Sequence, residues 1–91
     1  MALLNTMQSA VTSRFTLGDS RDTLAGFECD TVDLAWIDGG HDYSIARSDL
    51  DHAMRFRARW IAVDDAKAMP QVASAVDEAL AAHSDYEKIV D

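Results

Sequence analysis

The sequence contains little cysteine, proline or glycine and few positive charges. It has one cysteine, one proline and four glycines. A single cysteine cannot form a disulfide within the chain, so we expect a reducing, cytoplasmic setting. We expect Cys29 itself to be an inert thiol, buried or half-buried, because no histidine stands near it in the sequence.

Long apolar runs are also missing. No stretch approaches the roughly 20 apolar residues that span a bilayer, and the N-terminus lacks the pattern of a signal peptide. We therefore expect a soluble protein with no membrane partner. The 16 acidic residues outnumber the 8 basic ones and give a formal net charge of −8. So negative a surface does not attract nucleic acid, which we exclude as a partner.

The residues that are present favour one small globular domain over 1–91. Hydrophobic residues make up 48% of the 91-residue chain, and there is no repeat, linker or low-complexity tract. Segments with helical and strand periodicity alternate along the chain. This alternation predicts an α/β fold with a mostly parallel sheet flanked by helices.

Two buried strands are predicted with particular clarity. Val32–Ile37 and Trp60–Val63 are nearly continuous apolar runs, as expected of strands covered on both faces. Arg14–Leu17 and Tyr86–Val90 are shorter candidate strands. Ala2–Ala10 is predicted to be a short helix.

Three further helices are expected after these strands. Asp19 or Ser20 can cap a short helix that runs to about Gly26. Ser44 is expected to cap the next helix, and Pro70 suits the first turn of the last one, where its missing N–H costs nothing. Both longer helices have apolar residues at helical spacing, at Ala46, Leu50, Ala53 and Met54 and at Val72, Val76, Ala79 and Leu80.

Acidic residues follow both clear strands. Asp38 ends the first strand, and Asp64 and Asp65 end the second. Because the carboxyl ends of neighbouring parallel strands lie at one edge, we expect these three side chains to converge. Such carboxylates repel one another unless a cation lies between them, and oxygen ligands favour Mg²⁺ or Ca²⁺ over zinc. Taken singly, each acid is more often a helix cap or a solvent-facing residue than a ligand, and only the three together favour a cation site.

The residues after Asp38 suggest proton transfer. Gly39 and Gly40 allow a sharp turn and a close approach to a ligand. His41 follows on that turn and changes charge near neutral pH, so it is the natural base. Lys67 is an alternative base or a phosphate contact, although a lone histidine or lysine in a loop is more often simply a solvent-facing residue.

The segment Val32–Tyr43, which reads Val-Asp-Leu-Ala-Trp-Ile-Asp-Gly-Gly-His-Asp-Tyr, resembles the second half of a class I S-adenosylmethionine-dependent methyltransferase. Asp49-Leu50 and Ile61–Asp65 extend the resemblance, which covers about Phe15–Val76. More narrowly, it resembles the metal-dependent branch that contains catechol-type and macrolide-sugar O-methyltransferases. The resemblance implies transfer of a methyl group to a small-molecule hydroxyl, assisted by Mg²⁺ or another hard divalent cation.

The same resemblance implies roles for individual residues. The metal-binding acids of that branch fall on Asp38, Asp64 and Asp65. Its lysine or histidine base falls on His41. The stretch around Gly-Asp-Ser resembles the third-strand turn that holds the adenine of the cofactor, which implies that Asp19 and Ser20 contact S-adenosylmethionine.

The sequence also departs from the family pattern. The glycine-rich turn after the first strand and the ribose-binding acid after the second have no counterpart, since the glycines stand at positions 18, 26, 39 and 40. The resemblance therefore implies a partial Rossmann-like fold that lacks the first two strands. Open strand edges invite another chain, so we expect a rearranged sheet or a homo-oligomer that completes it.

Two other functions remain open. The chain can be a catalytically inactive methyltransferase remnant that acts as a binding or assembly module. It can also be a metal-dependent hydrolase, which His41-Asp42 beside an acid cluster would suggest. The hydrolase is disfavoured because only three histidines exist, and His52 and His83 read as helix-surface residues.

Overall fold

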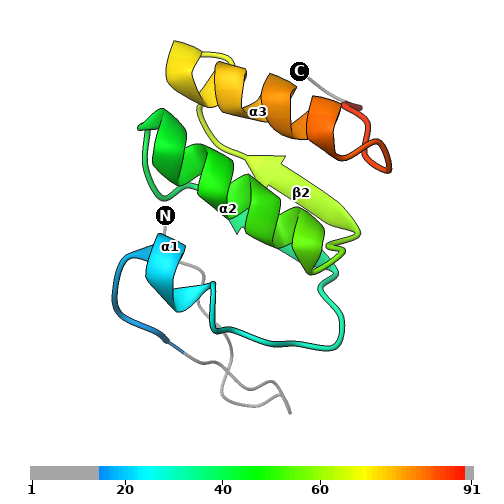
Figure 1. Ribbon diagram of the computed structural model, residues 1–91. Coiled ribbons are helices and arrows are strands. Elements are labelled where there is room, and N and C mark those ends of the chain that lie inside the picture. The colour runs from blue at the N-terminus through cyan, green and yellow to red at the C-terminus, as the bar shows by residue number, and fades with distance from the viewer. Residues whose placement is uncertain (1–14, 90–91) are drawn as a thin grey trace, which may run out of the picture.

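The computed structural model describes residues 15–89 and has an α/β architecture, as expected. The predicted helix Ala2–Ala10 lies outside the described residues. Figure 1 shows two longer helices over a pair of strands, with a one-turn helix at their side. In chain order the elements are α1 (Ser20–Thr23), β1 (Leu34–Ile37), α2 (Tyr43–Arg55), β2 (Trp60–Val63) and α3 (Pro70–Ala82).

The two strands pair in parallel, as the alternation of helices and strands along the sequence predicts. Leu34 lies beside Trp60 and Ile37 beside Val63. The pairing continues one residue further, because the Asp64 amide donates to the Ile37 carbonyl at 2.9 Å. In the described part of the chain the sheet has only these two strands. Their carboxyl ends therefore meet at one edge.

The core lies between the sheet and the two longer helices, which both cover the same face (Figure 1). The predicted stripe of α2 is buried throughout. In α3 the predicted stripe is fully buried at Val72 and Ala79 and partly buried at Val76 and Leu80, and Ala75 joins it. The buried apolar side chains are those of Ile37, Ala46, Leu50, Ala53, Met54, Ala58, Val72, Ala75 and Ala79.

Helix ends differ in part from the predictions. Asp42, not Ser44, caps α2, because its extended backbone leaves the carboxylate free to accept from the Ser44 amide at 2.8 Å. The Ser44 hydroxyl donates to the same oxygen at 3.0 Å, and these two hydrogen bonds lower the pKa of Asp42. Asp19 caps α1 as predicted, but the helix ends at Thr23 rather than near Gly26. Pro70 occupies the first turn of α3, as expected.

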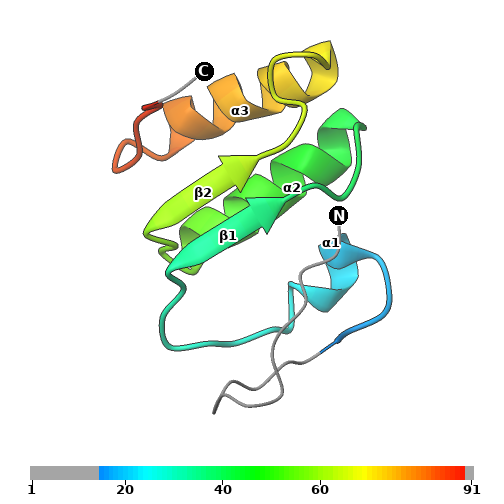
Figure 2. The same cartoon turned by 180° about the vertical axis from the view of Figure 1, so that it is seen from behind.

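The prediction that both faces of the strands are covered is wrong for the described residues. Leu34, Trp36 and Trp60 have 58%, 54% and 53% of their surface exposed. Figure 2 shows this side of the sheet with no helix of the described chain in front of β1 and β2. An apolar run reveals that a strand prefers burial, but the second covering layer must come from elsewhere in a fold.

The two shorter predicted strands are absent from the described chain. Residues 15–17 and 86–89 form no strand, while Arg14 and Val90 lie outside the described residues. Phe15 and Leu17 are almost fully exposed. Tyr86 instead donates its hydroxyl to the Ala58 carbonyl at 2.6 Å, which fastens the chain after α3 to the core. Neither segment pairs with β1 or β2, the two strands of the described residues.

Two further expectations concern the exposure of Cys29 and the membrane-spanning capacity of the helices. Cys29 is exposed, so the expectation of a buried or half-buried thiol is wrong. It follows α1 in a stretch without regular structure. No helix within residues 15–89 has both the length and the apolar character that crossing a bilayer requires.

The exposed apolar face and the unpaired strand edges are both features that another copy of the chain could cover, so we still predict a homo-oligomer. We expect light scattering after size exclusion to give a mass of at least two chains. Leu34→Lys should shift the protein toward the monomer, because a charge on an edge strand opposes pairing with another chain. Leu17→Lys is the matched control, since Leu17 is 94% exposed and outside the sheet. A well-folded wild-type monomer would contradict the prediction.

Candidate functional site

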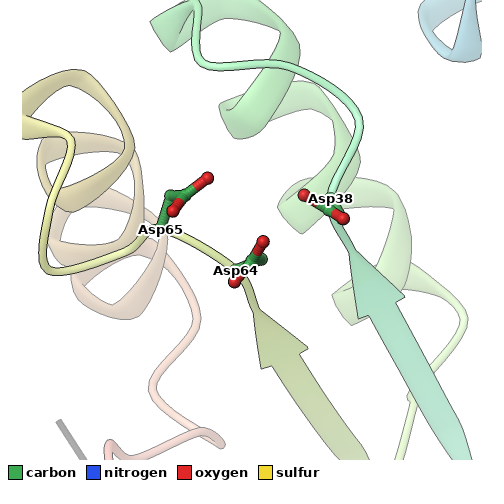
Figure 3. A group of neighbouring side chains, drawn as sticks. All are labelled: Asp38, Asp64 and Asp65. Carbon is green, nitrogen blue, oxygen red and sulfur yellow. The ribbon is translucent and has the colours of Figure 1, made fainter. Parts of the chain in front are cut away.

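The three predicted acids lie together beyond the carboxyl ends of the two strands. Asp38 follows β1, and Asp64 and Asp65 follow β2 (Figure 3). Each contributes a carboxylate oxygen that lies within 4.8 Å of the others. Asp38 and Asp64 are exposed, and Asp65 is half-buried. The cluster is therefore open to solvent and to a ligand.

The spacing of these oxygens suits a hard divalent cation. Opposite ligands lie about 4.1 Å apart around Mg²⁺ and about 4.6–5.2 Å apart around Ca²⁺, twice the usual metal–oxygen distance. All three oxygens lie within 4.8 Å of one another, so they are close enough to share one Ca²⁺, and sharing one Mg²⁺ requires any pair beyond its limit to move closer. The all-oxygen donor set points the same way.

His41 is part of the same group. Its Nε2 lies 2.8 Å from Oδ2 of Asp65, which joins the turn after β1 to the turn after β2. In the tautomer whose Nε2–H donates to Asp65, Nδ1 carries the lone pair and can accept a proton. Asp65 has a positive φ of 59°, a left-handed conformation that aspartate tolerates better than most residues. The turn thereby directs its carboxylate to both His41 and the other acids.

The predicted cofactor contacts lie at the start of α1, where Asp19 is the cap and Ser20 the first helical residue. Asp19 accepts the Arg21 amide at 2.9 Å and pairs with the Arg21 guanidinium, with Nη2 at 2.6 Å from Oδ2. These hydrogen bonds lower the pKa of Asp19 to about 2. Gly18 has a φ of 141°, and a Cβ there would meet Thr23 at 2.9 Å, so this turn requires glycine. Ser20 donates its hydroxyl to Asp49 at 2.6 Å.

The other residues considered from the sequence lie away from the acids or act differently. His52 contacts Arg55 and Phe56, and His83 pairs with Asp51 at 3.1 Å. Of the three histidines, His41 alone pairs with an acid of the cluster in the described chain. Lys67 is exposed in the connection between β2 and α3.

Sequence reasoning missed Asp49 as a functional candidate. It lies on α2 and is the one buried charged side chain of the described residues, at 8% exposure. Its position among Ala46, Leu50 and Ala53 places it on the apolar stripe of the helix. A carboxylate on such a stripe is the signal that could have identified it, because burying an unpaired charge is costly.

One comparison with known proteins gives a match. The sequence profile of a family described as a methyltransferase domain matches residues 2–66, more than half of the chain. No curated protein and no solved structure matches. The two-stranded parallel sheet with three helices is consistent with part of a methyltransferase fold.

The hydrogen bonds to Asp19 predict an unusual titration. We expect its carboxyl carbon, followed by NMR, to titrate near pH 2 instead of near its ordinary pKa of 3.8. Because the folded-state pKa is lowered, the stabilisation is present above about pH 4 and is lost as the pH falls toward 2. In Arg21→Gln the pKa should rise toward 3.8, whereas Arg55→Gln should leave it unchanged. Titration of wild-type Asp19 near 3.8 would refute the pairing.

Proposed function

The chain belongs to the methyltransferase-domain family, and on that premise we propose that it supplies the cation-binding and proton-accepting part of an O-methyltransferase site. The acceptor is a small molecule with a hydroxyl group, and the methyl donor is S-adenosylmethionine. The observation that carries the proposal is the convergence of three carboxylates and an imidazole at the ends of two paired strands.

In this proposal the three acids bind the cation and His41 accepts the proton. Asp38, Asp64 and Asp65 would hold Mg²⁺ or a similar cation at the edge that faces the acceptor. Asp65 also orients the His41 ring, so that the free ring nitrogen can take the proton of the acceptor hydroxyl. When bound, the cation lowers the pKa of that hydroxyl, and the cofactor supplies the methyl group. Methyl transfer would form one oxygen–carbon bond and break one sulfur–carbon bond, and His41 would hold the proton released by the acceptor hydroxyl.

Asp19 and Ser20 are the predicted cofactor contacts, and both already have hydrogen-bond partners within the chain. Ser20 and Asp19 lie in the turn that the family resemblance assigns to the adenine. The hydroxyl hydrogen of Ser20 already serves Asp49, and both oxygens of Asp19 serve Arg21. Their remaining lone pairs can still accept from an exocyclic amine. The glycines stand at positions 18, 26, 39 and 40, so the glycine-rich turn with which the family holds the rest of the cofactor has no counterpart near the N-terminus of this sequence.

A second candidate function is favoured by one observation, the exposed apolar face formed by Leu34, Trp36 and Trp60. Such a face suits a catalytically inactive module that binds or assembles with other chains. The module can retain the cation, because the acids do not depend on this face. Cofactor binding therefore separates the two functions better than cation binding does.

The cation site predicts a defined set of affinities. Mn²⁺ binding, followed by the loss of its free EPR signal, should weaken by about tenfold or more in Asp38→Asn, Asp64→Asn and Asp65→Asn, because each substitution removes a charged ligand. Asp77→Asn removes the same charge from an exposed position on α3, with 71% of its side chain accessible. It should bind as the wild type does. Equal losses in all four variants would mean that only net charge attracts the ion.

Cofactor binding tests the enzymatic function. We expect calorimetry with S-adenosylmethionine to give a binding heat, larger when Mg²⁺ is present. Asp19→Asn should weaken it, since that carboxylate fixes the turn and is a predicted contact. Asp77→Asn again provides the control. Absence of binding both with and without Mg²⁺ would remove the enzymatic function for the isolated chain and favour the assembly module.

A further inference from the structure

We propose that Asp49 is a positioning residue that holds the Gly18–Ser20 turn and the Asp38–His41 turn in a fixed relation. The consequence for catalysis rests on the proposed function, because one turn carries the predicted cofactor contacts and the other carries Asp38 and His41. The mechanical link itself follows from the packing around Asp49 and can be tested without any ligand.

Burial is the first reason for assigning a role to Asp49. Its side chain lies on the covered face of α2 with only 8% exposure, while every other buried side chain of the described residues is apolar. An apolar residue of similar size would fill this position without the cost of desolvating a charge. The carboxylate is therefore explained by what it contacts.

One oxygen of Asp49 holds the first turn. Ser20 Oγ donates to Asp49 Oδ1 at 2.6 Å, across 29 residues of sequence. This distance is in the range of a charge-assisted O–H···O bond, which is about twice as strong as a neutral one. Ser20 begins α1, so the bond anchors α1 against the middle of α2, where Figure 1 shows the two helices side by side.

The other oxygen lies against the second turn. A Cβ built on Gly39 would come within 3.1 Å of Asp49 Oδ2, tighter than ordinary van der Waals contact. Neither Gly39 nor Gly40 has a positive φ, so backbone conformation does not require glycine there. At Gly39 a side chain would instead crowd the Asp49 carboxylate. A shift of the Asp49 carboxylate would therefore change the packing around Gly39, the residue next to Asp38.

A second contact joins α1 to the start of α2 and is weaker. Arg21 Nη1 donates to Ser44 Oγ at 3.4 Å, and both side chains are exposed. A long, solvated hydrogen bond of this kind contributes little. Asp49 is the buried connection between the two turns.

NMR tests the link without a ligand. In the full chain, Ser20→Ala should shift the amide resonances of Gly39 and Gly40, because the freed carboxylate moves against the turn. In an Asp49→Asn background the contact with Ser20 persists, so Ser20→Ala should still shift them. In an Asp49→Ala background the shift should disappear. Unchanged Gly39 and Gly40 resonances in Ser20→Ala would overturn the proposal.

Cation affinity then separates positioning from a merely structural role. Asp49→Ala should weaken Mn²⁺ binding about tenfold, in line with other residues that orient metal ligands, and Asp49→Asn should retain most of the affinity. Gly39→Ala should weaken binding in the wild-type background and much less in Asp49→Ala, where the added methyl group has room. Leu80→Ala is the control, since it removes partly buried apolar contact near the end of α3.

The possible results are distinguishable. Equal loss of affinity in Leu80→Ala and Asp49→Ala, measured where both are folded by circular dichroism, would mean that stability alone is responsible and would overturn the positioning role. Failure of the wild type to bind Mn²⁺ would instead contradict the proposed cation site. In that case the amide shifts of Gly39 and Gly40 still decide whether Asp49 links the two turns.

Discussion

The parallel pairing of β1 with β2 is the constraint on which the rest of the structure depends. Each strand is four residues long, and the acids follow directly after its last residue. A change of register by one residue would turn the helix-facing side chains outward and displace Asp38 from Asp64. The packing of α2 and α3 on one face fixes the register, because Ile37, Ile61 and Val63 must all meet the helices.

Site and fold are connected through α2. Its N-terminus is capped by Asp42, directly after His41, and its middle carries Asp49 beneath the Gly39 turn. The helix therefore controls both ends of the Asp38–His41 segment. The other face of the sheet contributes nothing to this arrangement, which explains how a chain with an exposed apolar face can still assemble the acids and the imidazole.

The predictable features are those encoded locally. The two strands, both longer helices and the acids at the strand ends follow from apolar runs, helical spacing and terminal aspartates that lie within a few residues. The exposure of Trp36 and Trp60 was not predictable, because an apolar run does not reveal whether a second layer exists. Asp42 and Ser44 are both good caps, and only the backbone decides between them. The pairs Ser20–Asp49 and His41–Asp65 join residues 29 and 24 apart, which local patterns do not reveal.

The proposed site binds one divalent cation where the two strands end. Paramagnetic broadening of backbone amide resonances by substoichiometric Mn²⁺ tests it most directly, since the effect falls steeply with distance from the ion. We expect the amides of Asp38, Gly39, Asp64 and Asp65 to broaden first and together. Broadening spread evenly over the acidic surface, or centred on another group of acids, would contradict it.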